Sequence, residues 1–312
     1  MLRYVARQLL QMAVTVLGIV TVVFFLVRAI PGDPAAYMLG DYATPESVEA
    51  LRAQMGLDLP LTTQYLRFMG RAFTGDLGDS VVTGQPALEQ ALESLPPSAA
   101  LAVSGILIAV AIGLPLGVIT AVRQGTWTDL LVMLAALLGI SFPVFWLGLV
   151  SILLLSHKLG LFPALGGSST DNLIGQLYHL ALPALVLGVS VAAYITRLTR
   201  SAMLEVLGQD HILVARAMGL PERQIVYQLA LRNALIPVLA IIGVTFAWSL
   251  GNAILIEAVF SRPGLGSMIL KAVFARDYQL VQAGVLVLAV AVVLVNTALD
   301  LSYAVIDPRR RA

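Results

Sequence analysis

The stretch MLEVLGQDHILVARAMGLPERQIVYQLALRNALIP, residues 203–237, is a polar helical segment between two long apolar runs. Asp210 is a candidate N-cap for a short helix over residues 211–218, because its side chain can accept a hydrogen bond from the first helical turn. Gly219 supplies the left-handed residue that commonly ends a helix. The first half of this segment is therefore predicted to be a short capped helix.

The second half of the segment predicts another helix that starts at once. Pro221 fits its first turn, and Glu222 complements the positive end of its dipole. One face of this helix is apolar at helical spacing, and it consists of Ile225, Val226, Leu229 and Ala230. Two short helices with a tight break would form a rigid knob from Gln209 to Leu220, in contrast to a solvated connector.

The composition indicates a protein solvated mainly by lipid. Of the 312 residues, 59% are hydrophobic and 12% are charged, and the mean hydropathy is +0.90. Soluble domains carry about a quarter charged residues. The net charge of +1 comes without a basic stripe, so nucleic acid is not an expected partner. The absence of cysteine excludes disulfides and thiolate metal sites.

Six apolar runs predict an all-α integral membrane protein with six transmembrane helices. The first run is longer than a signal-peptide core and no small-x-small cleavage site follows it, so a retained span is expected in preference to a cleaved signal. The six predicted spans cover residues 9–27, 98–122, 130–156, 180–196, 234–256 and 280–299.

Basic residues predict the orientation and the division of the chain. Arginines gather on the face that would hold both termini and the segment at 200–236, which the positive-inside rule makes cytoplasmic. Residues 31–97 hold three arginines against nine acidic residues, which predicts a small extracytoplasmic subdomain. We therefore divide the chain into residues 1–30 with the first span, residues 31–97, and a core at 98–312 with the other five spans.

Helices are also expected outside the spans. Two helices are expected in the subdomain. The first is PESVEALRAQMG, which Gly56 ends, and the second is LTTQYLRFMGRAF. FSRPGLGSMILKAVFARDYQ, residues 260–279, predicts a turn followed by a short helix that Ser267 caps and that lies against the membrane.

The sequence lacks the motifs that most enzymes and ion-coupled carriers need. A phosphate-binding P-loop needs Lys followed by Ser or Thr, whereas Lys158 precedes Leu159 and Lys271 precedes Ala272. No HExxH or GxSxG motif is present. A selective channel would need a filter or charged rings, and a proton-driven carrier would need mid-membrane carboxylates.

A few residues inside the spans are candidates for a translocation pathway. SFPVFWLG at 141–148 places a proline kink beside aromatic side chains, which marks Phe142, Pro143 and Trp146. Asn252 and Glu257 could contribute to one cavity wall. Equally, Glu257 could reach the headgroup zone and Asn252 could form an interhelical hydrogen bond. Glycines such as Gly117 and Gly188 are expected to permit close helix approach.

Residues 203–237 resemble the cytoplasmic coupling loop of ABC-importer permeases of the dipeptide, oligopeptide and nickel transport family. Further similar stretches are RAIPGDPA, GLDLPLTTQYLRFMGRAFTGDLGDS, FPVFWLGL and RPGLGSMILKAVFARDYQLVQAGVL. Together they cover nearly the whole chain. The chain departs from the general loop motif Glu-Ala-Ala-x-x-x-Gly, because Leu213 and Val214 stand where Glu and Ala would be, while Ala215 and Gly219 are kept.

The resemblance implies a type I ABC importer fold and a set of partners in a bacterial plasma membrane. These partners are a second, homologous permease, two ATPase subunits inside and a solute-binding protein outside. ATP and Mg would bind the ATPases, and this chain would hold no cofactor or metal. The ATPase contacts would involve Glu205, Asp210, Ala215, Arg216, Ala217, Gly219, Leu220 and Arg223.

Several functions are compatible with this sequence. The resemblance favours a non-catalytic permease subunit that takes up dipeptides or oligopeptides. The same assembly could import nickel or another small solute. A six-span channel or ion-coupled carrier working alone, and an intramembrane enzyme, are alternatives from other classes.

Overall fold

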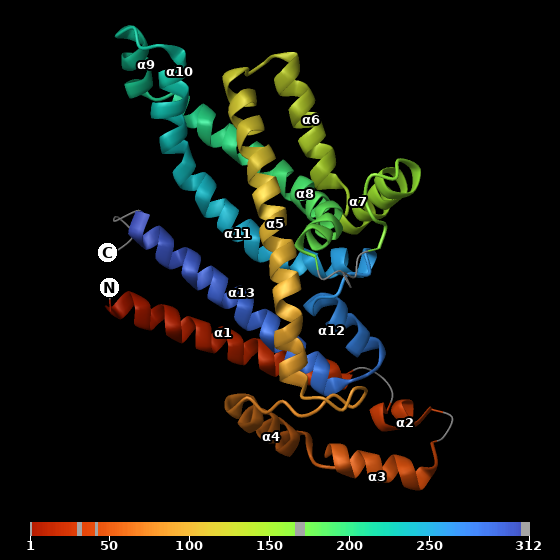
Figure 1. Ribbon diagram of the computed structural model, residues 1–312. Coiled ribbons are helices and arrows are strands. Elements are labelled where there is room, and N and C mark those ends of the chain that lie inside the picture. Colours follow the sequence, from red (N-terminus) through yellow and green to blue (C-terminus); the bar gives the residue numbers. More distant parts are fainter. Residues whose placement is uncertain (1, 30–32, 41–42, 166–171, 307–312) are drawn as a thin grey trace. The chain divides into compact units, whose positions relative to one another are not determined.

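The chain folds almost entirely into helices, as a computed structural model shows for residues 2–29, 33–40, 43–165 and 172–306 (Figure 1). Within these ranges the only β-structure is an isolated bridge between Asp79 and Pro86. A backbone N–H or C=O without a partner is costly in lipid, and helices pair these groups internally. The predicted all-helical class is confirmed.

The helices fall into two units, which are described separately. The first unit consists mainly of residues 1–97 and 263–298, and the second mainly of residues 98–262. In chain order the helices are α1 (Leu2–Ala29), α2 (Pro34–Leu39), α3 (Pro45–Met55), α4 (Leu61–Thr74), α5 (Ala87–Val122), α6 (Trp127–Ser141), α7 (Val144–Ser151), η2 (Ile152–Lys158), α8 (Leu173–Leu207), α9 (Asp210–Ala217), α10 (Glu222–Gln224), η3 (Ile225–Ala230), α11 (Leu231–Val259), α12 (Leu265–Phe274) and α13 (Tyr278–Ile306).

Five of the described helices are long and apolar enough to cross a membrane, and a bent pair of helices makes a sixth candidate. The bent pair replaces the single span predicted at 130–156. α6 and the helix over Val144–Lys158 meet at an angle of 103°. Phe142 between them is extended, because the residue before a proline is driven out of the helical region and Pro143 has no N–H to donate. The kink predicted at Pro143 is therefore present, and the segment predicted as one span consists of two helices that meet there.

Two other spans begin earlier than predicted. α5 starts at Ala87 and continues through Pro96 and Pro97, where the sequence suggested a boundary. Ala87 and Ala91 of its first turns are fully buried, so tertiary packing outweighs the hydrogen bonds that the prolines cannot make. α8 starts at Leu173 instead of residue 180, with Asn172 as its N-cap.

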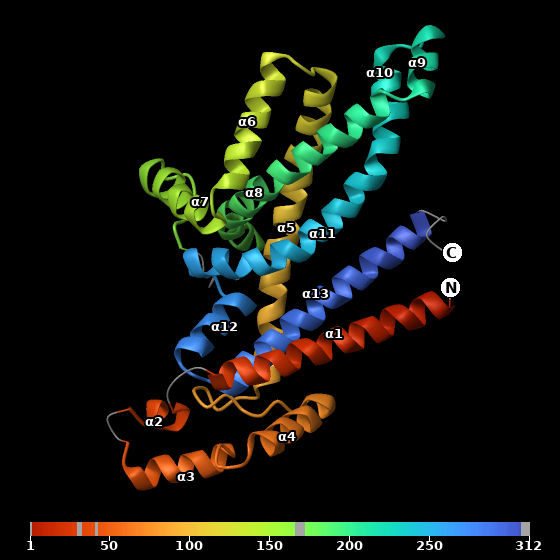
Figure 2. The same ribbon diagram turned by 180° about the vertical axis from the view of Figure 1, so that it is seen from behind.

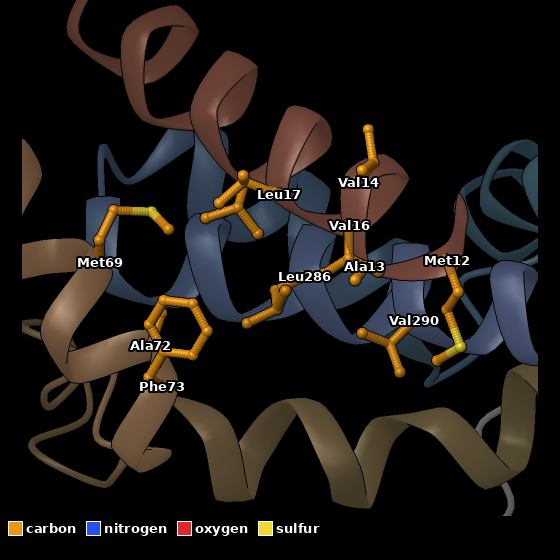
Figure 3. A pocket seen from close by; sticks show the side chains of 11 residues that line it. Met12, Ala13, Val14, Val16, Leu17, Met69, Ala72, Phe73, Leu286 and Val290 are labelled. Carbon is orange, nitrogen blue, oxygen red and sulfur yellow. The ribbon is translucent and has the colours of Figure 1, made fainter. Parts of the chain in front are cut away.

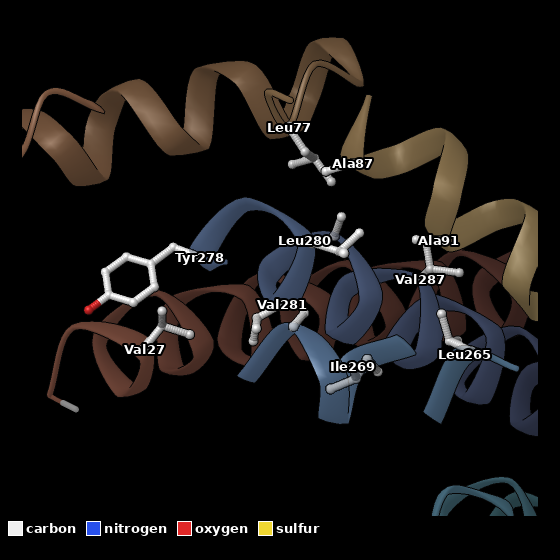
Figure 4. Packing of buried hydrophobic residues seen from close by; sticks show 12 residues of the cluster. Val27, Leu77, Ala87, Ala91, Leu265, Ile269, Tyr278, Leu280, Val281 and Val287 are labelled. Carbon is white, nitrogen blue, oxygen red and sulfur yellow. The ribbon is translucent and has the colours of Figure 1, made fainter. Parts of the chain in front are cut away.

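In the first unit, α1 and α13 lie side by side and run in opposite directions, as both views show (Figures 1 and 2). Side chains of α1, α5, α12 and α13 form its core, together with Leu77 (Figure 4). Val27 of α1 and Tyr278 of α13 belong to this cluster. The apolar faces of these helices therefore pack against one another.

The two helices predicted after the first span are present. Thr44 and Ser47 cap α3 reciprocally, and Gly56 ends α3 with a φ of 67°. α4 covers the predicted LTTQYLRFMGRAF stretch. Its Tyr65 hydroxyl lies 2.9 Å from the Thr21 hydroxyl of α1. Aromatic packing adds to this contact, because the Phe24 and Phe68 rings stack with centroids 5.5 Å apart.

The predicted short helix after the fifth span is α12, but its cap differs. Gly264 is the N-cap, and Ser267 lies three residues inside, where its hydroxyl accepts a hydrogen bond from the Gly264 N–H at 3.1 Å. Ser267 is thus not the N-cap that the sequence suggested, although it satisfies the same helix end. One face of α12 is buried, through residues that include Leu265 and Ile269.

In the second unit, glycines let α5 and α8 approach closely, as predicted. A Cβ atom on Gly117 would lie 2.5 Å from the Cβ of Thr199, and one on Gly188 would lie 2.7 Å from the Cβ of Ile108. Such distances are shorter than any van der Waals contact. The seam between these two helices therefore requires glycine on both sides.

A buried ion pair joins α6 to α8. The Arg200 guanidinium donates two hydrogen bonds to the Asp129 carboxylate, at 2.7 and 2.8 Å. The Asp129 side chain is only 8% exposed. This bidentate geometry compensates for removing both charges from water, whereas loss of one partner would strand a buried charge.

We expect Gly117→Ala to destabilise the purified chain by about 1–3 kcal/mol, because the added methyl group overpacks the seam between α5 and α8. Gly251→Ala is the matched control, since a Cβ atom there meets nothing within 4 Å. It should be neutral or stabilising, because alanine favours helix. Thermal unfolding in detergent measures both changes. Equal melting temperatures for the two variants would contradict the proposed seam.

Candidate functional site

Residues 203–237 form the tip of a helical hairpin in the second unit. α8 and α11 pack along each other, and α9 and α10 lie where they join (Figure 1). α9 is the predicted short helix. The second predicted helix is not short, because α10, η3 and α11 form one continuous helical stretch, Glu222–Val259. The tip is therefore one short helix held between two long ones.

The start of α9 differs from the prediction by one residue. Gln209 is the extended N-cap residue, with φ −79° and ψ 149°, and Asp210 is the first residue of the helix. No side-chain hydrogen bond caps this end. Asp210 still lies in the first turn, where a negative charge complements the helix dipole.

The end of α9 is the predicted glycine stop. Gly219 has a φ of 82°. Its N–H donates to the Arg216 carbonyl at 3.0 Å, and the Leu220 N–H donates to the Ala215 carbonyl at 3.2 Å. This is a Schellman arrangement, which satisfies the last carbonyls of the helix and reverses the chain within three residues. Pro221 then precedes the next helix.

An apolar core fixes α9 to the two long helices. Ile212 is fully buried and Ala215 is 7% exposed. They belong to a cluster with Met203 of α8 and Ile225 of η3. Burial of one such isoleucine contributes about 1.5–3 kcal/mol. α9 is therefore expected to move with the hairpin as a single body.

The opposite side of α9 combines exposed apolar and charged side chains. Of the eight residues predicted for coupling, Ala215 is buried, Leu220 is half-buried and six are exposed: Glu205, Asp210, Arg216, Ala217, Gly219 and Arg223. The large exposed apolar side chains there were not predicted. They are Leu213 at 53%, Val214 at 57% and Met218 at 76% exposed. The i, i+4 spacing of Val214 and Met218 in the sequence was the available signal.

An exposed ion pair connects the two sides of the break. The Arg216 Nε lies 2.8 Å from the Glu222 Oε1, with the side chains 41% and 64% exposed. Exposed pairs of this kind contribute at most about 1 kcal/mol. Since the buried apolar core already fixes the break, both side chains remain available for contacts with a partner.

The long helix that follows contains a π-helical stretch, η3, directly below the tip. Such segments are rare and often lie at functional sites. η3 places Ile225, Val226 and Ala230 in the buried cluster, as the predicted apolar face required. The widened turn itself has no signature in the sequence.

The candidate pathway residues do not gather at one place. Phe142 and Trp146 stack with ring centroids 4.4 Å apart. They are 39% and 41% exposed, on either side of Pro143. Glu257 is only 1% exposed and accepts a hydrogen bond from the Ser98 hydroxyl.

Asn252 is half-buried and lies five residues before Glu257 on α11. At about 100° per residue, their side chains point in different directions. The Glu257 side chain thus lies in the interior of the second unit, where its hydrogen bond with Ser98 joins α11 to α5. Asp300, an acidic residue near the predicted inner end of the sixth span, has a side chain outside the described part of the chain.

This architecture, with five to six apolar helices and a short helix at a hairpin tip, is that of a polytopic membrane protein. Residues 113–312 match the family described as binding-protein-dependent transport system inner membrane component, and residues 1–101 match its N-terminal counterpart. The chain belongs to this family of inner-membrane transport components. The family that the sequence suggested is confirmed.

Similar proteins cover nearly the whole chain. A dipeptide transport system permease protein of Alkalihalophilus pseudofirmus is 38% identical and covers 99% of each chain. A glutathione transport system permease protein of Escherichia coli is 38% identical, over 100% of this chain and 99% of its own. A putative peptide transport system permease protein of Brucella suis is 39% identical over 95% of each.

Two solved structures share the fold. The MetNI methionine ABC transporter in an inward-facing conformation aligns with a TM-score of 0.55 at 22% identity, over 70% of this chain and 96% of the other. An amino acid ABC transporter aligns with a TM-score of 0.51 at 13% identity, over 71% and 94%. The predicted importer permease fold is therefore confirmed.

We expect Gly219→Ala to loosen α9, because an L-residue in the left-handed region costs about 1–2 kcal/mol. No atom lies within 4 Å of the added Cβ position, so the cost arises from the backbone alone. Amide exchange in α9 should accelerate by roughly fivefold to thirtyfold. Gly208→Ala, at a φ of −84°, is the control and should leave the exchange unchanged. Equal protection in both variants would disprove the role of the glycine stop.

Proposed function

We propose that this chain is a permease subunit of an ATP-driven importer of dipeptides or other short peptides. The single observation that carries the proposal is the tip of the hairpin. There a buried core fixes α9, while apolar and charged side chains, including Met218 at 76% exposure, lie on its surface. The peptide substrates named for relatives that match over nearly the full length support the substrate class.

The nucleotide chemistry belongs to partner subunits in this proposal. The chain lacks a P-loop, so two ATPase subunits would bind ATP and Mg on the side of α9. A second, homologous permease would complete the pathway, and a solute-binding protein would deliver the peptide from outside. The description of the matched family, a component of binding-protein-dependent transport systems, supports these partner classes. The heterodimer is our inference.

Charge supports the orientation that the mechanism needs. The predicted inner segments hold most of the arginines, and the positive-inside rule makes that face cytoplasmic. These arginines are Arg3, Arg7, Arg123, Arg197, Arg200, Arg216, Arg223, Arg232, Arg309, Arg310 and Arg311. α9 would then meet the ATPases, and residues 31–97 would lie on the extracytoplasmic face.

Force transmission follows from the continuity of the helices. α8 has 35 residues and extends about 52 Å at 1.5 Å per residue. A shift of α9 by an approaching ATPase pair would displace the inner ends of α8 and α11 together, because Ile212 and Ile225 share one core. Two packed arrangements of a rigid element can couple distant sites in this way.

The pathway residues remain part of the proposal. The break at Pro143 exposes the stacked Phe142 and Trp146, which could contact a passing peptide. Asn252 and Glu257 of α11 would respond to the same helix movement, Glu257 through its hydrogen bond to Ser98.

Assembly provides the direct test of function. We expect the chain to co-purify with a second permease and two ATPases, and dipeptide with its binding protein to stimulate ATP hydrolysis by the reconstituted assembly. The chain alone should neither hydrolyse ATP nor move peptide in liposomes. Peptide uptake by the chain alone would show a channel or carrier and would end the proposal.

Variants of the tip test the coupling. Arg216→Glu and Gly219→Pro should each reduce peptide uptake at least tenfold while ATP hydrolysis persists and the protein still reaches the membrane. For Arg216→Glu the exposed ion pair is worth at most about 1 kcal/mol, so the fold should survive.

A charge swap separates the coupling role from a structural one. Arg216→Glu combined with Glu222→Arg restores the intrachain pair but reverses the charge that a partner would meet, so uptake should stay low. Arg123→Glu, at an exposed position outside the tip, is the control and should transport normally. Full uptake in the swap variant would limit Arg216 to a structural role.

A further inference from the structure

The first unit contains a polar cavity that α1, α4 and α13 line together. Its volume is about 160 Å³, and its wall carries three arginines against a single carboxylate, Asp76. Arg28 is already engaged, because its Nε donates to the Gln64 Oε1 at 2.9 Å and its guanidinium lies 3.6 Å from the centre of the Phe24 ring. The cavity has an excess of positive charge.

Two arginines of this cavity have spare hydrogen-bonding capacity. Arg67 has no ion pair or hydrogen bond with any side chain that the structure describes. Arg71 approaches Asp76 only at 4.0 Å, and both side chains are more than half exposed. A guanidinium binds phosphate or carboxylate oxygens through paired N–H groups. The cavity therefore favours an anion.

A buried amide points to the same ligand site. Gln282 is only 6% exposed, and its Nε2 has no hydrogen-bond partner. The Oε1 of Gln279, one turn earlier on α13, is also buried without a partner. Both residues line the polar cavity. Buried polar groups almost always have partners, so the Gln282 Nε2 indicates a missing acceptor, as a phosphate oxygen would be, and the Gln279 Oε1 indicates a missing donor.

An apolar groove follows the polar cavity along the same three helices. Its volume is about 620 Å³, and its wall includes Leu17 of α1, Met69 and Phe73 of α4, and Leu286 of α13 (Figure 3). From Gln282 to Leu286 is one turn of α13. From Arg28 to Leu17 is about 16 Å along α1, at 1.5 Å per residue. The groove and the cavity share no lining residue, but on α4 and α13 their walls come within one helical turn of each other.

α4 has the character of a helix at a membrane surface. Leu66 is 69% exposed and Phe73 is 82% exposed on its apolar side. Arg67 and Arg71 lie on its polar side. A helix that carries arginines together with exposed Leu and Phe side chains is typical of helices that lie among lipid headgroups.

We infer that the first unit binds an anionic glycerophospholipid. Arg67, Arg71 and the Gln282 amide hold its phosphate, and an acyl chain occupies the groove beside Phe73 and Leu286. The excess of positive charge in the cavity explains why the headgroup is anionic, and the apolar groove explains where the acyl chain lies. A small soluble anion would use only the polar cavity and leave the groove unfilled.

The test uses the complete importer assembly and phosphatidylglycerol as the probe. After a delipidating detergent wash, native mass spectrometry should find phosphatidylglycerol retained in preference to phosphatidylcholine. Arg67→Gln combined with Arg71→Gln should reduce the retained lipid at least tenfold. Arg123→Gln combined with Arg197→Gln removes two exposed arginines that line neither cavity, and it should retain the lipid as the wild type does.

A second variant guards against misfolding as an explanation. Gln282→Met conserves the volume but removes the unpartnered amide, so without lipid it should be at least as stable as the wild type. Added phosphatidylglycerol should raise the melting temperature of the wild type and should raise that of Gln282→Met much less. An equal rise in both would overturn the inference.

A soluble headgroup analogue separates the two possible sources of the anion. Glycerol 3-phosphate should leave the melting temperature unchanged at concentrations where phosphatidylglycerol raises it. Equal stabilisation by glycerol 3-phosphate would show a soluble-anion site and overturn the lipid assignment. Equal lipid loss in the control pair of arginine variants would also overturn it.

Discussion

The absence of water around the spans is the constraint on which the rest of the structure depends. In hydrocarbon every backbone N–H and C=O must find a partner within the chain, and the described residues meet this demand with helices alone. The same constraint governs buried charges. Asp129 and Arg200 form a bidentate pair, and Glu257 accepts from Ser98. Polar groups in the second unit thus fix helix against helix.

Close packing makes these helices move together as rigid elements. Without a hydrophobic driving force between helices in lipid, van der Waals contact and small residues hold them together. Gly117 and Gly188 let α5 and α8 meet at distances that any side chain would prevent. At the other end of α8, Ile212 and Ala215 fix α9 to the hairpin. A partner that moves α9 must therefore move α8 and α11 as well.

Exposed apolar surface has two meanings in this protein. On the spans it meets lipid, and it needs no further explanation. At the tip of the hairpin, Met218 and Val214 are exposed on a segment rich in charged residues, which fits a protein partner. On α4, Phe73 is exposed beside arginines and a cavity with an unpartnered amide, which fits a lipid. The neighbouring polar groups, rather than the apolar area, distinguish the two surfaces.

The sequence by itself determined the helical class, the family and the position of the tip, because these follow from hydropathy, short motifs and the glycine stop at Gly219. The sequence indicated a kink at Pro143, whereas only the tertiary structure decided its angle of 103°, the early start of α5 at Ala87 and the path of the helix through η3. It also decided which side chains are buried, so that Glu257 faces Ser98 and Gln282 faces a cavity. The reason is physical: local patterns set what a segment prefers, whereas burial and hydrogen-bond partners come from residues far apart in the chain.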